Sequence, residues 1–378
     1  MIYLDNAATS LHKPKGVAKA VFEAINTLAS PSRGTYASAL DADRIVFDTR
    51  EKLKTLFNVE SSSLVAFTSN ATESLNIAIK GTLLPGDHVI TTAMEHNSVL
   101  RPLYEMEKKG ISLTILPCDN KGNFSHEEME SAIHEETKAI ICTHASNLTG
   151  NLVDIRSVGE LCRKHHLLFI LDASQTAGVF PIDMEKHLID ILCFTGHKGL
   201  MGPQGTGGLC LRGEVRPRPL ITGGSGIQTF EREHPSYMPT ALEAGTLNAH
   251  GIAGLHAALS FIEKEGLEKI RRKEQSLAAY FYEEVKKIKG VKVYGDFTHK
   301  NRAAIISLNL GETDSSIVSD ELAERFGIYT RSGGHCAPLM HKTFGTERQG
   351  MVRFSFSSMN TFLEADCAIK AIKTLMEE

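Results

Sequence analysis

Short runs of apolar residues recur through the first part of the chain, separated by stretches with helical periodicity. Their apolar character is continuous rather than alternating, which is typical of strands that are buried on both faces. The pattern therefore predicts an α/β domain in which helices cover a mostly parallel, seven-stranded sheet. The predicted strands are residues 64–67, 88–91, 113–116, 139–143, 167–171, 189–194 and 208–211.

The pattern changes after about residue 255, where a long helical stretch is followed by isolated apolar runs. These segments are 254–266, 267–289, 291–294 and 304–308. They predict a smaller α+β unit, and Gly251 and Gly254 mark the boundary. We expect a large domain over residues 15–255 and a small domain built from residues 1–14 and 256–378.

Length and composition agree with two domains of a soluble globular protein. The 378 residues exceed the size of about 250–300 residues at which a single core stops growing. Hydrophobic residues make up 42% of the chain and charged residues 23%. The net charge of −4 gives no field that would gather nucleic acid or an anionic membrane, so we expect a small-molecule ligand.

The N-terminus and the cysteines indicate the compartment. Residues 1–8 show no basic segment followed by an apolar one, and no later stretch is long and apolar enough to span a membrane, so a cytoplasmic location is expected. The 7 cysteines are odd in number and form no C-x-x-C pair, which argues against a disulfide framework and a zinc site. We expect no metal, and we expect cysteines within apolar runs, such as Cys142, to be buried.

Charged residues stand at the ends of two predicted strands. Asp172 follows the run 167–171, and Lys198 follows the run 189–194. Ligands of such sheets bind beyond the carboxyl ends of the strands. A neighbouring lysine and aspartate suit a pyridoxal cofactor, because its aldehyde requires an amine and its ring nitrogen an acid partner. An ordinary ion pair is the alternative, and these two residues alone do not decide between them.

A phosphate group would require donors at the N-terminus of a helix. The segment Thr68–Glu73 lies between the first predicted strand and a helical pattern, and it carries hydroxyl and amide side chains. We predict Thr72 as the phosphate ligand. A helix cap without any ligand would show the same pattern.

Two further strand ends carry side chains suited to the same cofactor. His96 follows the run 88–91, and Asn147 follows the run 139–143. An imidazole can stack on a pyridine ring, and an amide can bond to its phenolic oxygen. Each alone is typical of a loop, but agreement among five strand ends favours a single site.

Together these residues resemble the class V aminotransferases, and within them the cysteine desulfurases. The resemblance extends over essentially the whole chain. The motifs that carry it are Tyr3–Thr9, Thr68–Glu73, Glu95-His96, Ser146-Asn147, Asp172–Gln175, Gly196–Lys198, Glu243–Thr246 and Arg331–Ala337. It implies the fold of type I enzymes that depend on pyridoxal 5'-phosphate (PLP), and a homodimer with shared active sites.

The resemblance also implies roles for individual residues. Lys198 would bond covalently to PLP, Asp172 would pair with its ring nitrogen, and His96 would stack on the ring and take part in catalysis. Thr246 would reach the phosphate of the partner subunit's site. The full set of implied cofactor residues is Asn70, Ala71, Thr72, His96, Asn147, Asp172, Gln175, Thr195, His197, Lys198 and Thr246. The implied substrate-binding residues are Asn6, Ala7, Arg331 and Arg353.

The segment Arg331–Ala337 combines two glycines, basic residues and a thiol. Neighbouring His or Arg side chains favour the thiolate form of a cysteine, whereas by itself Cys336 could equally be structural. The segment resembles the R-x-G-H-H-C-A motif of the short-loop subgroup, which includes SufS-like enzymes and selenocysteine lyases. The likeness implies that Cys336 accepts sulfur. Gly334 stands where a histidine is usual, which leaves the tuning of the thiol and the preferred acceptor open.

The expected reaction converts L-cysteine to L-alanine and leaves a persulfide on Cys336 for delivery to an acceptor protein. Iron–sulfur cluster assembly, tRNA thiolation and selenium recycling are the candidate pathways. The alternatives are a selenocysteine lyase or another class V aminotransferase or C–S lyase. A non-catalytic binding protein of the same fold should lack Lys198.

Overall fold

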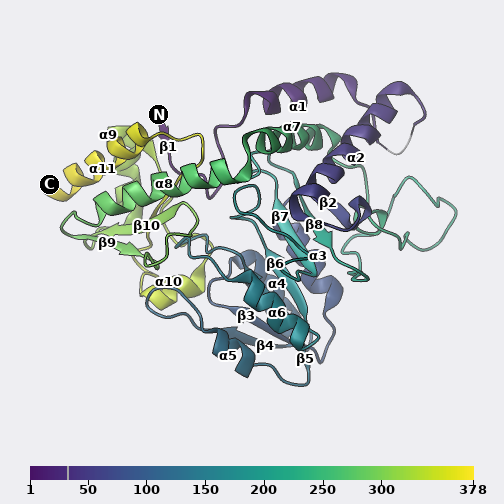
Figure 1. Ribbon diagram of the computed structural model, residues 1–378, viewed down its shortest axis with the longest axis horizontal. Helices are drawn as coiled ribbons and strands as arrows, with labels where there is room; N and C mark the ends of the chain where they lie inside the picture. Colours follow the sequence, from purple (N-terminus) through teal and green to yellow (C-terminus); the bar gives the residue numbers. More distant parts are fainter. Residues whose placement is uncertain (32–33) are drawn as a thin grey trace.

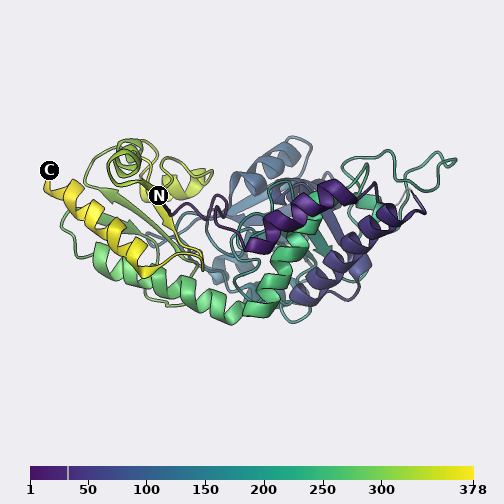
Figure 2. The same ribbon diagram turned by 90° about the horizontal axis from the view of Figure 1, so that it is seen from above.

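The computed structural model describes residues 1–31 and 34–378. The molecule is elongated and has two lobes (Figures 1 and 2). The larger lobe contains the long sheet, and the smaller lobe contains both chain termini. Helix α7 (Ala249–Glu265) packs in the larger lobe, and α8 (Leu267–Val285) continues from it along the smaller one.

The large sheet confirms the predicted fold class. Its seven strands lie in the order β2-β8-β7-β6-β5-β3-β4, and each coincides with a predicted run apart from small shifts at the ends. Strand β8 is antiparallel to both of its neighbours, and the other pairings are parallel. The strands are β2 (Val65–Thr68), β3 (His88–Thr92), β4 (Ser112–Leu116), β5 (Thr137–Thr143), β6 (Leu168–Asp172), β7 (Ile191–Thr195) and β8 (Gly207–Leu211).

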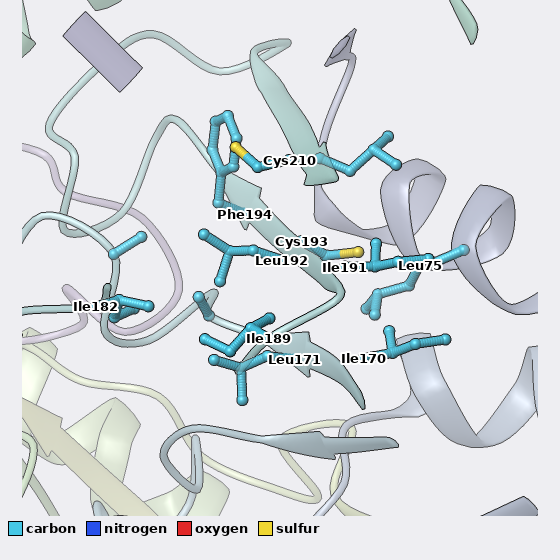
Figure 3. Packing of buried hydrophobic residues seen from close by; sticks show 14 of the residues in the cluster. Leu75, Ile170, Leu171, Ile182, Ile189, Ile191, Leu192, Cys193, Phe194 and Cys210 are labelled. Carbon is cyan, nitrogen blue, oxygen red and sulfur yellow. The ribbon is translucent and has the colours of Figure 1, made fainter. Parts of the chain in front are cut away.

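The central strands are buried on both faces, as their continuous apolar runs predicted. Figure 3 shows Ile191 and Cys193 on one side of β7, near Leu75 of helix α3 (Ala71–Thr82), whereas Leu192 and Phe194 point to the other side. Cys142, Cys162, Cys193 and Cys210 are buried free thiols, which confirms the expectation for cysteines in apolar runs.

Helices pack on the sheet and on one another. Helix α3 contacts β7, β8 and α4, while α1 and α2 both pack against α7. Two short 3-10 helices cover Ser62–Leu64 and Thr240–Leu242. The remaining helices of the large lobe are α1 (Lys15–Thr27), α2 (Ala37–Phe57), α3 (Ala71–Thr82), α4 (Asn97–Glu107), α5 (His126–Ser131) and α6 (Ile155–Lys164).

The small lobe has a second core around an antiparallel sheet of order β12-β10-β9. The N-terminal strand β1 (Ile2–Tyr3) joins this lobe by pairing in parallel with β11 (Ile328–Tyr329). Its other elements are β9 (Val291–Tyr294), β10 (Ile305–Leu310), β12 (Val352–Ser355), α9 (Ser315–Phe326), α10 (Pro338–Phe344) and α11 (Phe362–Glu377).

The predicted domain division, with residues 15–255 in one part and residues 1–14 and 256–378 in the other, stays a prediction. The position of Leu4 supports this division, because Leu4 packs in the core of the small lobe although it is far in sequence from the rest of that core. Within residues 1–31 and 34–378, none of the helices has the length and apolar character required to cross a membrane.

Candidate active site

Polar side chains surround a cavity of about 460 Å³ at the carboxyl edge of the large sheet. Asp172 ends β6 and Thr195 ends its parallel neighbour β7, so the two strand ends lie side by side. Every predicted cofactor residue except Thr246 lines this cavity. Its walls consist of Asn70, Ala71, Thr72, His96, Ser98, Thr143, Asn147, Asp172, Ser174, Gln175, Thr195, His197 and Lys198.

Lys198 lies in the turn that follows β7. Burial lowers the pKa of its ammonium to about 8, against the opposing effect of Asp172. The ion pairs of the described residues do not include one between Lys198 and Asp172, although Asp172 is close enough to raise the pKa of Lys198. A lysine with a pKa of about 8 has a far larger neutral fraction near pH 7, about one molecule in ten, than an ordinary lysine with a pKa of about 10.4. The neutral amine is the form that attacks a carbonyl carbon.

Asp172 is buried, and the backbone N–H of Ser174 donates to its Oδ1 at 2.9 Å. The hydroxyl of Ser174 donates to the same oxygen. Among residues 1–31 and 34–378, both of these bonds use Oδ1, so Oδ2 is left for a donor in the cavity. A buried carboxylate requires such a partner, and a protonated ring nitrogen would be one.

His96 is the N-cap of α4, where its Nδ1 accepts from the backbone N–H of Ser98 at 3.0 Å. Burial lowers the pKa of His96 to about 4, and the nearby Lys198 lowers it further. The ring is therefore neutral near pH 7, and its Nδ1 is the acceptor nitrogen. A neutral imidazole fixed in this way can stack against an aromatic ligand without placing a second cation beside Lys198.

The N-terminus of α3 forms another wall of the cavity. Asn70 is its N-cap and accepts from the backbone N–H of Glu73 at 3.0 Å. The N–H groups of Ala71 and Thr72 have no partner within the helix, because the first turn of a helix has none to offer. Together with the helix dipole they favour an anion. Ser98 bonds to the Thr72 hydroxyl at 2.8 Å.

His197 forms the opposite side of this anion-binding region. Its Nδ1 lies 3.0 Å from the hydroxyl oxygen of Thr9, and its carbonyl oxygen accepts from the backbone N–H of Ser10 at 2.9 Å. Burial, followed by the charges of Lys198 and Lys13, lowers the pKa of His197 to about 4. The N-terminal segment therefore fixes the orientation of this ring.

The residues present fit PLP. Asn147 Oδ1 and Thr195 Oγ1 are buried and have no hydrogen-bond partner among residues 1–31 and 34–378. Leaving a buried polar atom unsatisfied costs roughly 1–3 kcal/mol, so this wall is built for a polar ligand. An amine, a carboxylate, a neutral imidazole and a helix N-terminus lie around the same space, and they match the aldehyde, ring nitrogen, ring face and phosphate of PLP.

A second cavity of about 490 Å³ shares Lys198 and Gln175 with the first. Asn6 and Ala7, two predicted substrate-binding residues, line it. The Gln175 side chain donates to the Ala7 carbonyl at 3.2 Å, which joins the N-terminal segment to the cofactor cavity. Lys198 thus stands between the two cavities.

Arg353 lies on β12, and Arg331, in the segment after β11, pairs with it through an isolated antiparallel β-bridge. Arg353 is fully buried; its Nη2 donates to Asp5 Oδ1 at 2.8 Å and its Nη1 to the Asn147 carbonyl at 2.9 Å. The Arg331 guanidinium makes no hydrogen bond within the part of the chain that the structure describes. Neither residue lines the two cavities, but both lower the pKa of Lys198 and so lie close to it.

Cys336 is partly exposed in the loop between β11 and α10. Its carbonyl oxygen accepts from the backbone N–H of Asn97 at 2.8 Å, which joins the cysteine to the helix that His96 caps. The φ angles of His335 and Cys336 are 50° and 54°. Left-handed residues other than glycine cost of order 1–3 kcal/mol each and persist only where neighbours hold them.

Gly334, the departure from the family motif, is exposed, and a Cβ placed on it would meet no atom within 4 Å. The Cβ of a larger residue would therefore meet no clash at this position. The absence of an imidazole here leaves His335 as the only histidine adjacent to Cys336 in sequence.

Thr246 lies apart from Lys198. It lines a separate cavity of about 590 Å³ together with Ser69 and Glu73, beside the N-terminus of α3. The role assigned to it in a partner's site stays a prediction.

Several residues at the site were not assigned roles from the sequence. Ser98 contacts both Thr72 and His96, and Asp5 pairs with Arg353. Glu95 is buried below the site, where Thr92 Oγ1 and Thr143 N donate to it, and burial raises its pKa to about 8. Ser98 follows His96 by two residues, as Ser174 follows Asp172. This spacing is the sequence signal that could have identified each serine as a hydrogen-bond partner of the side chain before it.

Known proteins resemble this chain over nearly its whole length. The family model described as Aminotransferase class-V matches residues 2–367. A probable cysteine desulfurase of Methanothermobacter thermautotrophicus is 32% identical, covering 95% of this chain and 91% of its own. A probable cysteine desulfurase of Pyrococcus abyssi is also 32% identical, with 100% and 94% covered. The apo structure of a cysteine desulfurase from Thermococcus onnurineus NA1 superposes with a TM-score of 0.93 at 31% identity, and 100% of this chain and 94% of that chain are covered.

Proposed function

The chain belongs to the class V aminotransferase family, and we propose that it is a PLP-dependent cysteine desulfurase in which Lys198 holds the cofactor and Cys336 accepts sulfur. The observation that carries the proposal is the position of Lys198. Lys198 has a lowered pKa, forms no ion pair with Asp172 and lines both cavities. These properties suit an amine that reacts with a cofactor in one cavity and exchanges protons with a substrate in the other.

PLP, when bound, supplies an electron-accepting ring that stabilises negative charge on the substrate carbon next to the amino group. Asp172 would hold a proton on the ring nitrogen, and His96 would cover one ring face. Asn147 and Gln175 would contact the phenolic oxygen. The phosphate would lie at the N-terminus of α3 against Thr72, Asn70 and Ala71, with Thr195 and His197 beside them.

Lys198 would also move protons. Once it is released from the cofactor as a neutral amine, it can remove the proton from the substrate Cα and return a proton later in the cycle. Its pKa of about 8 is close to the pH at which a general base is efficient.

Arg331 and Arg353 would bind the substrate carboxylate. The Arg331 guanidinium is free for this purpose among the described residues, whereas Nη1 and Nη2 of Arg353 already donate to the Asn147 carbonyl and to Asp5, which leaves its Nε. Two cations beside Lys198 also favour its neutral form. Asn6 and Ala7 would line the substrate side.

With Cys336 as the acceptor, the transfer of sulfur conserves atoms and electrons. The Cys336 thiolate attacks the substrate sulfur, an S–S bond forms, and the substrate's C–S bond breaks. The electron pair of that bond stays on the carbon side, which is protonated and leaves as L-alanine. Cys336 retains the persulfide. A sulfur-acceptor protein or a thiol reductant must then remove the terminal sulfur.

We propose that the enzyme is a homodimer with shared active sites. Phe22 and Ile25 on α1 and Phe47 on α2 are large apolar side chains that are 71%, 59% and 56% exposed. Phe22 and Ile25 are three residues apart and share one face of α1, and exposed apolar side chains gathered on a face are typical of an association surface. Thr246, which lies outside its own chain's cofactor cavity, would complete the partner's site. A cytoplasmic location and a role in iron–sulfur cluster assembly are parts of the same proposal.

The test is to measure alanine formed from L-cysteine by the wild type and three variants. Lys198→Ala should lose activity and the absorbance of covalently held PLP. Cys336→Ser should lose alanine formation but keep that absorbance. Cys367→Ser, which changes another partly exposed cysteine, should match the wild type. Full activity in Cys336→Ser would remove Cys336 from the mechanism.

The same assay separates the alternatives. A selenocysteine lyase would turn over L-selenocysteine even as Cys336→Ala while showing little activity on L-cysteine, because selenium leaves more easily. Another class V reaction would give glutamate or pyruvate in place of alanine.

A further inference from the structure

A row of buried polar side chains lies below the Cys336 loop. His335 and His341 are each 2% exposed, and Thr346 is 3% exposed. His341 belongs to α10, and Thr346 follows it after Gly345, which ends that helix with a φ of 67°. None of the three lines the cofactor cavity. The proposed reaction gives them no role, although burying three polar groups is costly unless they are paired.

The two histidines meet edge to edge. Nδ1 of His335 lies 3.5 Å from Nε2 of His341, and the ring planes differ by 5° with centroids 5.7 Å apart. The distance between the centroids is close to the distance between the two nitrogens plus the distance from each nitrogen to its own ring centre, which is the largest separation that this contact allows. The rings therefore lie nearly in one plane and in one line, which is the geometry of an N–H···N hydrogen bond rather than of face-to-face stacking.

The partners at each end fix the direction of the protons. Nε2 of His335 lies 3.0 Å from the Arg331 carbonyl oxygen, which can only accept, so Nε2 carries the hydrogen. Burial lowers the pKa of His335 well below its usual value, so the ring is neutral and its Nδ1 must accept. His341 therefore donates from Nε2.

His341 is neutral for the same reason, since burial lowers its pKa too. Its Nδ1 then accepts, and the Thr346 hydroxyl, 2.8 Å away, is the donor. The hydrogen bonds run in one direction, from Thr346 through His341 and His335 to the Arg331 carbonyl. Each member has a single arrangement that satisfies its neighbours.

This series of hydrogen bonds ends at the turn that contains Cys336, where the backbone is strained. His335 and Cys336 are both left-handed, and the Asn147 side chain holds the His335 carbonyl at 2.7 Å. Asn97 holds the Cys336 carbonyl from the other side. The His335 ring is a further attachment of this turn, and it is the one that the hydrogen bonds through His341 and Thr346 hold in place.

We propose that Thr346 and His341 are positioning residues that, through His335, hold the Cys336 thiol in place for sulfur acceptance. The inference rests on the proposed function of Cys336 and adds two residues on another element of the fold. It also explains why the loop can have Gly334 where a histidine is usual, because His335, His341 and Thr346 hold Cys336 in position.

Thr346→Val is the first test, because it keeps the shape of the side chain and removes the donor. Alanine formation should lose about tenfold in kcat while KM for L-cysteine and PLP absorbance stay within about twofold, since a small displacement of a reacting group lowers the chemical rate. Thr346→Ser retains the hydroxyl and should restore the wild-type rate. A Thr346→Val enzyme with a lower Tm but unchanged kcat would overturn the proposal.

A second measurement does not depend on turnover. Amide hydrogen exchange in residues 334–337 and at Asn97 should accelerate in Thr346→Val and His341→Phe, and it should remain slow in Thr346→Ser. Unchanged exchange in both variants would also overturn the proposal. If the wild type forms no alanine, the proposed function fails by itself, and the exchange data still decide whether the hydrogen-bonded chain anchors the loop.

Discussion

Lys198, His96 and His197 lie around one cavity, and burial lowers the pKa of each of them. Near pH 7 and without a cofactor, both imidazoles are therefore neutral, Lys198 is neutral in part, and Asp172 is the buried carboxylate of the site. A bound phosphate would raise the pKa of His197, since a nearby anion favours the protonated form of the imidazole. The site is thus matched to an anionic, electrophilic ligand at the level of single side chains.

The pKa of Lys198 predicts the pH dependence of cofactor attachment. Only the neutral amine attacks the PLP aldehyde, so the rate constant for attachment to the apoprotein should rise about tenfold per pH unit below pH 8 and level off above it. Absorbance after rapid mixing, from about pH 6 to about pH 10, measures this rate. Free lysine side chains provide the comparison, since their rate should keep rising toward about pH 10.4. A protein rate that continued to rise beyond pH 9 would refute the lowered pKa.

Residues with reactive or charged side chains at strand ends can be predicted from the sequence, whereas residues that act through contacts distant in sequence cannot. Asp172 and Lys198 are identifiable because charges directly follow apolar runs. The partnership of Asp5 with Arg353 joins residues at opposite ends of the chain, and the closing of the small lobe brings them together. No local pattern encodes that contact.

At the scale of elements, the site depends on where strands end and helices begin. Helices α3 and α4 both start at the carboxyl edge of the sheet, and their caps, Asn70 and His96, contribute directly to the cavity. The seven strands and the break between α7 and α8 at Gly266, where φ is 83°, followed from the sequence. The antiparallel direction of β8 did not, because a buried run of apolar residues carries no information about direction.

Close packing between β8 and the α3 cap gives a prediction at this scale. A Cβ on Gly207 would lie 2.7 Å from Asn70 Cα and 2.9 Å from the Phe194 carbonyl oxygen. Gly207→Ala should therefore displace the N-terminus of α3 and weaken PLP binding by about tenfold or more. Equilibrium dialysis of PLP measures the affinity.

Gly334→Ala is the matched control, because the space around Gly334 is open. It should bind PLP as the wild type does. Equal PLP affinities of Gly207→Ala and the wild type would show that α3 does not need its present position to hold the phosphate.

At the scale of the whole molecule, both lobes and the N-terminal segment enclose Lys198, and the enclosure buries carboxyl groups. Glu95 is buried close to Asp172, and Glu274 of α8 lines the second cavity. Burial raises the pKa of each to about 8. The sequence predicted two units with the site on the large one, but it could not predict which acidic groups the packing of the lobes would enclose.

These two groups predict how stability changes with pH. A carboxyl whose pKa is raised on folding keeps a proton that the unfolded chain releases above its pKa of about 4.3. Its contribution is fully present below that pH and is lost as the pH rises to about 8, by at most about 1.4 kcal/mol per unit. Glu95→Gln removes this loss, so its stability relative to the wild type should increase between about pH 5 and pH 8.

Urea unfolding of the apoproteins measures the difference, and Glu274→Gln should behave in the same way. The exposed Glu324→Gln variant should follow the wild type at every pH. A constant difference between Glu95→Gln and the wild type across this range would mean that Glu95 is ionised in the folded protein.

The most direct test of the central claim is a single turnover without reductant. The purified PLP-loaded enzyme is mixed with a limiting amount of L-cysteine, and alanine is quantified together with the mass of the peptide that contains Cys336. We predict one alanine for each Cys336 that gains one sulfur atom, with no gain on the other six cysteines. Alanine formed without sulfur on Cys336, or sulfur on another cysteine, would contradict the account.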